Sequence, residues 1–155
     1  MEKLKIYVNG KEYKNIFTRV IWSGAIHGTA RKLEVEYLGD IITNIGDEIV
    51  FSYEDEKLFY GKVFQHSRKG ETEIKSFYAY DNSIYLNKNN FVKNFFQKKP
   101  SEILKEIYGE LNLKVGKFPK DEVTCTYPAI DRTGYEIILN AYTIQYRKNK
   151  KFILL

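Results

Sequence analysis

The sequence predicts an α+β protein: an antiparallel β-barrel followed by a smaller α/β segment with two short helices. Three observations support this prediction. Residues 1–80 contain several short runs that alternate between apolar and polar side chains, which is typical of strands with one buried face. Asn9-Gly10 separates two of these runs and is a strong signal for a tight hairpin. Helical patterns appear only after residue 99.

The first predicted strands lie on either side of Asn9-Gly10. Leu4, Ile6 and Val8 alternate with more polar residues, so one face of this segment is expected to be buried. A return strand through Tyr13 leads into a longer strand at residues 16–23, which carries the only tryptophan, Trp22. The opening of the chain is therefore predicted to be a hairpin followed by a third strand.

The strand predicted at residues 31–38 alternates most regularly. Leu33, Val35 and Tyr37 share one face, and the residues between them are charged. Gly39-Asp40 ends the pattern. Further strands are predicted at residues 47–53, 58–67 and 71–80, with turns at 54–57 and 68–70. Sequential strands joined by short turns favour a small barrel or sandwich.

The first helix is predicted to begin at Pro100. Proline suits the first helical turn, and Glu102 complements the helix dipole there. Asn112 or Gly116 is expected to end the helix. The apolar stripe consists of Ile103, Leu104, Ile107 and Leu111.

The second helix is predicted to start at Thr133. Thr133 and Glu136 form a capping-box pattern, and Ile137, Ile138 and Ala141 give the helix an apolar face. A basic turn is expected at residues 147–151, and an apolar strand at residues 152–155. The predicted organisation is a β-barrel domain at residues 1–80, a connector at 81–99 and a small α+β domain at 100–155. This last domain is expected to be incomplete, because the chain stops within a strand.

Composition excludes several classes of protein. The chain has 155 residues, enough for one domain or two small ones. Its single cysteine, Cys125, rules out an internal disulfide and fits a reducing compartment. Neither a signal peptide nor a membrane span is predicted. A net charge of +5 permits nucleic-acid binding without requiring it, while the 15% aromatic content favours β-structure and interfaces.

No catalytic, metal or cofactor site is predicted. His27, His66 and Cys125 are too far apart in sequence to suggest a metal site, and structural roles are favoured for them. The carboxylates at residues 54–56 occupy a hairpin tip, and Asp131 is expected to help cap the second helix. We therefore expect a protein that is not an enzyme, and a cell-wall hydrolase is disfavoured for the same reason.

Aromatic side chains are the candidates for contact with other molecules. Trp22, Phe91, Phe95 and Phe96 are predicted as subunit-interface or surface-aromatic residues. Lysines interleave with the three phenylalanines, a combination found in single-stranded nucleic-acid binders. The alternative function is therefore a single-stranded nucleic-acid-binding β-barrel. Inward packing of these phenylalanines with lysines outside is the favoured interpretation, because phenylalanine is more often buried.

Short segments in a fixed order carry a family resemblance across nearly the whole chain. They are Asn9-Gly10-Lys11, Ile21-Trp22-Ser23-Gly24, Ala30-Arg31-Lys32-Leu33-Glu34-Val35, Asp47-Glu48-Ile49, Phe59-Tyr60-Gly61-Lys62-Val63, Tyr78-Ala79-Tyr80-Asp81, Tyr85-Leu86, Pro100-Ser101-Glu102-Ile103-Leu104 and Thr133-Gly134-Tyr135-Glu136-Ile137-Ile138-Leu139. In this order and spacing they resemble the N-terminal half of XkdQ-type baseplate hub proteins. Those hubs belong to the late control protein D family of phages and prophages with contractile tails.

The resemblance implies a structural role without a cofactor or an active site. Hubs of this type are trimers under the tail tube, and each subunit carries two tail-tube-like barrels, so that three subunits form a pseudo-sixfold ring. Residues 1–80 correspond to the first barrel, and the second is missing from this chain. The implied partners are tail tube, spike and baseplate proteins and further copies of the chain, with no membrane and with nucleic acid only passing through the lumen. The implied location is the tail of a phage or tailocin particle that is assembled in the bacterial cytoplasm.

Overall fold

The computed structural model describes residues 3–25, 30–39, 41, 43–68, 73–117 and 120–149. The chain divides into two compact units, Met1–Ile84 and Tyr85–Leu155. His27, the turn residues Lys69-Gly70 and the strand predicted at residues 152–155 lie outside the described residues.

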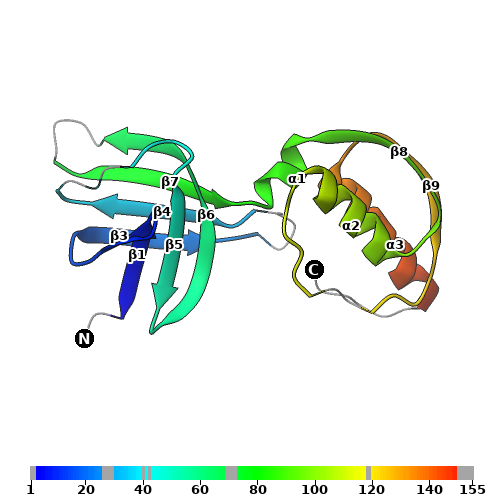
Figure 1. Cartoon of the computed structure of the whole chain (residues 1–155), viewed down its shortest axis with the longest axis horizontal. Coiled ribbons are helices and arrows are strands. Elements are labelled where there is room, and N and C mark those ends of the chain that lie inside the picture. Colours follow the sequence, from blue (N-terminus) through cyan, green and yellow to red (C-terminus); the bar gives the residue numbers. More distant parts are fainter. Residues whose placement is uncertain are drawn as a thin grey trace. The chain divides into compact units, whose positions relative to one another are not determined.

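The first unit is one antiparallel sheet that curls into a half-barrel (Figure 1). Its spatial order is β2-β1-β5-β6-β7-β4-β3, so β2 and β3 form the two edges. The predicted antiparallel β architecture is confirmed, in the form of an open half-barrel. The strands are β1 (Leu4–Val8), β2 (Lys11–Tyr13), β3 (Phe17–Ser23), β4 (Lys32–Tyr37), β5 (Glu48–Tyr53), β6 (Glu56–Arg68) and β7 (Lys75–Asp81).

Tight turns connect the paired strands where residues adopt positive φ. Asn9 and Gly10 have φ values of 49° and 80°, as a two-residue hairpin turn between β1 and β2 requires. Glu54 and Asp55 make the corresponding turn between β5 and β6, with φ values of 49° and 69°. This charged turn was predicted two residues longer, but Glu56 already belongs to β6.

The core of the first unit lies on one face of the curled sheet. In β4, Leu33, Val35 and Tyr37 point into it, as the alternation predicts, while the three charged residues that alternate with them are only half-buried. The buried members of this core are Ile6, Val8, Leu33, Val35, Tyr37, Ile41, Ile49, Phe51, Phe59, Val63, Phe77 and Ala79. Every strand except the edge strands β2 and β3 contributes a buried residue to it.

The second unit pairs a two-stranded sheet with helices. Its elements are α1 (Ile84–Lys88), β8 (Asn90–Lys98), α2 (Pro100–Glu110), β9 (Cys125–Thr133) and α3 (Gly134–Asn149). The segment predicted as a connector, residues 81–99, instead contains α1 and β8. Strand β8 pairs with β9 from far along the chain, so no local hairpin signal marks it. The basic turn predicted at residues 147–151 is also wrong for residues 147–149, which form the last turn of α3, where basic side chains complement the helix dipole.

Both longer helices begin as their sequences predict. The Lys99 backbone N–H donates to Glu102 Oε2 at 2.7 Å, and Pro100 follows as the first helical residue. At α3, the Thr133 backbone N–H donates to Glu136 Oε2 at 2.9 Å, and the Glu136 N–H donates to Thr133 Oγ1 at 3.2 Å. This reciprocal arrangement is the predicted capping box.

Helix α2 ends where Asn112 takes a φ of 52°, one of the two predicted end points. Asp131, expected to cap α3, instead sits in a bulge of β9 with a φ of 51° and accepts a hydrogen bond from Asn90. The cap of α3 is therefore made by Thr133 and Glu136 without Asp131.

The core of the second unit lies between the sheet and the two longer helices. Its buried members are Leu86, Phe91, Phe95, Ile103, Leu104, Ile107, Cys125, Ala129, Ile137, Ile138, Ala141 and Tyr142. Lys93 of β8 reaches the acidic side chains Glu106 and Glu110 at the rim of this core, and the hydrogen bond that Lys93 donates to Glu110 raises the pKa of Lys93. These ion pairs tie the sheet to α2.

Candidate assembly surface

The two edges of the seven-stranded sheet differ in how well they are protected from further pairing. Strand β2 has only three residues, and Lys11 and Glu12 are charged. Strand β3 has seven residues, and its part from Val20 to Ser23 is uncharged and pairs regularly with β4. Short and charged edges resist the addition of another strand, whereas a long uncharged edge accepts one. Strand β3 is therefore the better candidate for pairing with another chain.

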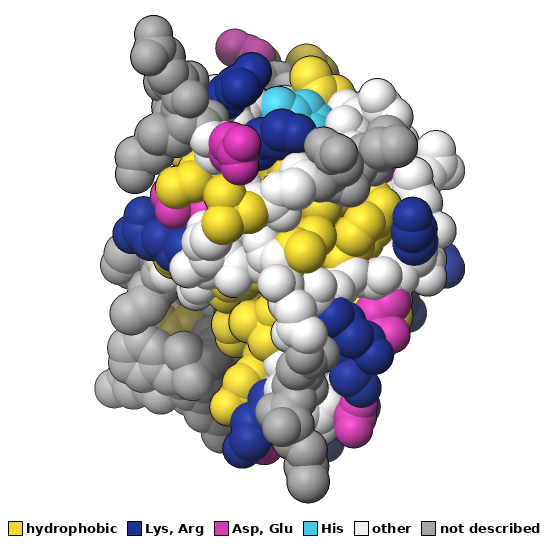
Figure 2. Space-filling model, turned by 90° about the vertical axis from the view of Figure 1, so that its left-hand side faces the viewer, with side chains coloured by type: hydrophobic (Ala, Val, Ile, Leu, Met, Phe, Trp, Pro, Cys, Tyr) yellow, Lys and Arg dark blue, Asp and Glu magenta, His cyan; other side chains and the backbone are white. Residues whose placement is uncertain are grey.

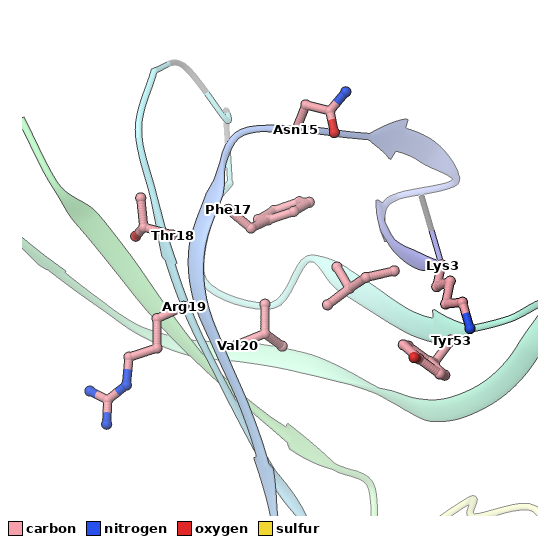
Figure 3. Close-up of a pocket in the computed structure, with 8 residues that line it drawn as sticks. Lys3, Asn15, Phe17, Thr18, Arg19, Val20 and Tyr53 are labelled. Atoms are coloured by element: carbon pink, nitrogen blue, oxygen red, sulfur yellow. The ribbon is translucent and has the colours of Figure 1, made fainter. Parts of the chain in front are cut away.

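A cleft of about 450 Å³ opens beside β3 (Figure 3). Phe17, Thr18, Arg19 and Val20 line it from β3. Lys3, Leu4, Asn15 and Tyr53 complete the lining. Leu4 of β1 and Tyr53 of β5 pair directly with each other, so the cleft lies between the β3 edge and the opposite end of the sheet. It is the opening of the half-barrel.

The wall of the cleft is apolar toward the core and polar at its rim. Leu4, Phe17 and Val20 are partly buried and pack against the core of the first unit. The charged side chains of the lining are paired within the unit: Lys3 with Glu54, and Arg19 with Glu36 at 3.6 Å. The cleft therefore suits a segment with apolar side chains facing inward more than it suits a small charged ligand.

The Lys5–Asp55 ion pair further fastens the β5–β6 turn to β1. The hydrogen bond and the charge of this pair raise the pKa of Lys5 and lower the pKa of Asp55. Both groups are therefore charged at neutral pH. Asp55 therefore lies at a solvated hairpin tip, as the sequence predicts, with its side chain 83% exposed.

The groups that sequence reasoning considered for catalysis do not converge in the described part of the chain. Cys125 is buried, and burial raises the pKa of its thiol, which makes it a poor nucleophile. His66 Nδ1 lies 3.2 Å from Thr43 Oγ1. Among the described residues, no group of three or more His, Cys, Asp or Glu side chains is arranged to hold a metal ion. No described helix combines the length and the apolar character needed to cross a membrane.

The four predicted surface aromatics fall into two groups. Trp22 is 38% exposed on β3, with the Arg31 guanidinium 5.2 Å from its ring centre, and Phe96 is 70% exposed on β8. Phe91 and Phe95 are buried in the core of the second unit, which does not fit a surface role for them. Adjacent strand residues face opposite sides, so Phe95 and Phe96 cannot both be exposed on one regular face.

Sequence reasoning missed two exposed apolar residues beside Phe96. Val92 and Ile130 are 76% and 70% exposed on β8 and β9. The signal was the same alternation that buries Phe91, Phe95 and Ala129 on the other face. Figure 2 shows a face of the molecule on which exposed hydrophobic side chains lie among lysine, arginine and acidic side chains.

The architecture defines a class of protein with the fold of phage tail proteins. The structure of a 43 kDa tail protein of prophage MuSo2 from Shewanella oneidensis matches 94% of the chain with a TM-score of 0.76 and 10% identity. A tail protein from Neisseria meningitidis MC58 matches 88% of the chain with a TM-score of 0.73 and 12% identity. The chain covers 49% and 44% of these two proteins, so it spans about half their length.

The chain belongs to the YQBQ-like family, whose family model matches residues 20–155. No curated protein matches it in sequence. The matched region includes β3 from Val20 onward and all later elements that the structure describes.

Proposed function

We propose that the chain is a structural component of a contractile phage tail or phage-like particle, acting at the baseplate hub that joins the tail tube to the spike. The observation that carries the proposal is the fold match to two solved tail proteins over 88–94% of the chain. The open sheet edge at β3 and the family resemblance in the sequence support the same role. The chain is proposed to act without catalysis, through contacts with neighbouring subunits.

The proposed mechanism is strand addition at the opening of the half-barrel. A neighbouring subunit places an extended segment along β3, where backbone hydrogen bonds continue the sheet. Its inward side chains enter the cleft beside Leu4, Phe17 and Val20. In the full-length context, three copies are proposed to form a ring around the lumen, in contact with tube and spike proteins.

The positions of the aromatic and basic side chains argue against the alternative function, single-stranded nucleic-acid binding. It needs exposed rings on which bases stack. Phe91 and Phe95 are buried, so only Phe96 of the three phenylalanines is available. Of the interleaved lysines, Lys93 is paired with Glu106 and Glu110, and Lys98 is paired with Glu106, so neither is free to meet phosphates.

The test is incorporation into particles. Tail particles are purified from a strain that produces the protein with Ile21→Lys, which puts a positive charge on the regular part of β3, outside the core. The matched control is Glu12→Lys on β2, an exposed position on the protected edge. Mass spectrometry then quantifies the protein in each particle preparation.

We expect the control protein in particles at the wild-type level and a loss of about tenfold or more for Ile21→Lys. Equal incorporation of both variants would show that β3 is not the assembly edge. Two results together would refute the hub role itself. Wild-type particles would contain none of the protein, and particles from a strain that lacks its gene would still have the tube joined to the spike.

A further inference from the structure

The second unit has an apolar face that no described residue covers. The β8–β9 sheet packs α2 and α3 against one face only (Figure 1). On its other face, Val92, Phe96 and Ile130 are 76%, 70% and 70% exposed. They are three of the four most exposed large hydrophobic residues in the described ranges.

The strand register brings these residues together on one surface. Asn94 is paired with Pro128, and Val92 lies two residues before Asn94, level with the bulge that contains Ile130. Phe96 lies at the other end beside Thr126, whose Oγ1 accepts a hydrogen bond from the neighbouring Gln97 N–H at 2.9 Å. We call this surface the outer face; its members are Val92, Asn94, Phe96, Thr126, Pro128 and Ile130.

The outer face carries no charged side chain. This is unusual in a chain that is 29% charged with a net charge of +5. Contact between two such faces therefore brings no like charges together and buries no unpaired charge. Asp131 and Arg132, which follow Ile130, are both exposed at one end. Both already have partners within their own chain: Arg132 is paired with Glu136 at 3.6 Å, and Asp131 accepts a hydrogen bond from Asn90.

The size of the outer face fits a modest interface between two copies. Its three large side chains present roughly 400 Å² of apolar surface, the level at which an exposed patch marks an interaction site. Two stacked copies bury roughly twice this area, and the neutral rim brings the total toward the lower end of specific interfaces, about 1,200 Å². Sheets stack face to face at about 10 Å, with their side chains interdigitated.

We propose that the outer face is a homotypic contact, in which the β8–β9 sheet of one copy stacks on the same sheet of a second copy about a two-fold axis. A neutral apolar partner face is what this surface requires, and a second copy supplies it. The contact uses a surface other than β3 and does not depend on the hub role.

Sedimentation of the purified chain over a range from micromolar to submillimolar concentration tests the proposal. We expect a monomer–dimer equilibrium whose dissociation constant rises about tenfold or more in Phe96→Ser and in Ile130→Ser. The matched control is Ile45→Ser, because Ile45 is 72% exposed but lies in the first unit. These side chains are exposed, so the substitutions leave both cores intact. Ile21→Lys on β3 should not change the equilibrium.

Oxidative crosslinking provides a second measurement. Of the single variants Val92→Cys, Phe96→Cys and Ile130→Cys, the one nearest the two-fold axis should form a disulfide-linked dimer under mild oxidation and Ile45→Cys should not, while the native Cys125 stays buried and unreactive. A chain that is monomeric throughout, or a dimer that Phe96→Ser and Ile130→Ser leave unchanged, overturns the proposal. Crosslinking of all three outer-face variants at no more than the level of Ile45→Cys does so as well.

Discussion

Gly61 in the centre of the first sheet has no space for a side chain. It lies in β6 between its pairing partners Ile49 of β5 and Asp81 of β7. A Cβ atom at this position would lie 2.2 Å from the Tyr80 carbonyl oxygen and 2.6 Å from a ring carbon of Phe59. The carbonyl belongs to the backbone of a paired strand, so it cannot move without disturbing the β6–β7 ladder. We therefore expect Gly61→Ala to destabilise the first unit.

The magnitude follows from the kind of atom that the Cβ meets. Forcing an extra carbon into a packed site costs about 1–3 kcal/mol, and contact with backbone places Gly61 at the upper end. The lower entropy of the unfolded alanine chain offsets about 0.5 kcal/mol. The net loss is about 2.5 kcal/mol, which moves the urea midpoint down by roughly 2 M for a unit of this size.

The assay is urea unfolding followed by tryptophan fluorescence. Trp22 is the only tryptophan and lies in the first unit, so its emission reports on that unit. The matched control is Gly109→Ala in α2, where an added Cβ meets nothing within 4 Å. We expect the control to leave the Trp22 transition in place and to stabilise the second unit by about 0.5–1 kcal/mol. A Gly61→Ala protein whose Trp22 midpoint matches the wild type would refute the packing described around β6.

Four further predictions concern the second unit. Thr133→Ala removes half of the capping box and should cost about 1 kcal/mol in thermal unfolding; no loss would contradict the cap. The hydrogen bond that the Thr133 backbone N–H donates to Glu136 lowers the pKa of Glu136 below its usual value. The contribution of Glu136 to stability is therefore complete at pH values above the usual pKa and is lost as the pH falls through the lowered pKa. The difference in thermal unfolding midpoint between the wild type and Glu136→Gln should therefore shrink from pH 7 to pH 3. A constant difference would argue against a stabilising role for the Glu136 carboxylate. Gly134→Ala should cost about 1 kcal/mol by calorimetry, less than Gly61→Ala, because the three atoms nearest its Cβ are side-chain atoms of Ile107, Leu86 and Phe91, the closest at 2.9 Å, rather than backbone atoms; an equal or larger cost would contradict this reasoning. Cys125 should resist thiol reagents until the second unit unfolds, and rapid labelling of the native protein would show that it is accessible.

The first unit was largely predictable because its signals are local. Alternation in β4 and the turn at Asn9-Gly10 depend only on near neighbours, and both appear as expected. The open edge at β3 was not predictable, because closure of a barrel depends on how the ends of a sheet meet in space. The sequence pattern is the same for a closed barrel and for a half-barrel.

Strand β8 was missed for a different physical reason. Its side chains alternate in burial, but apolar residues stand on both of its faces, as in Phe91-Val92 and Phe95-Phe96, so the polarity of the run does not alternate. Its partner β9 follows only after helix α2. Polarity alone therefore did not separate Phe95, which is buried, from Phe96, which is exposed. A strand that pairs at long range through bulges leaves little local signal.

Hydrogen exchange of β3 tests the assembly role most directly. Backbone amides of residues 17–23 are compared between the purified chain and intact tail particles. In the free chain, the amides on the unpaired side of β3 should exchange rapidly, while those bonded to β4 are protected. In particles, the rapidly exchanging amides of β3 should become protected, whereas those of β2 should not. Unchanged exchange along β3 in particles would contradict the proposal that a neighbouring subunit completes this edge.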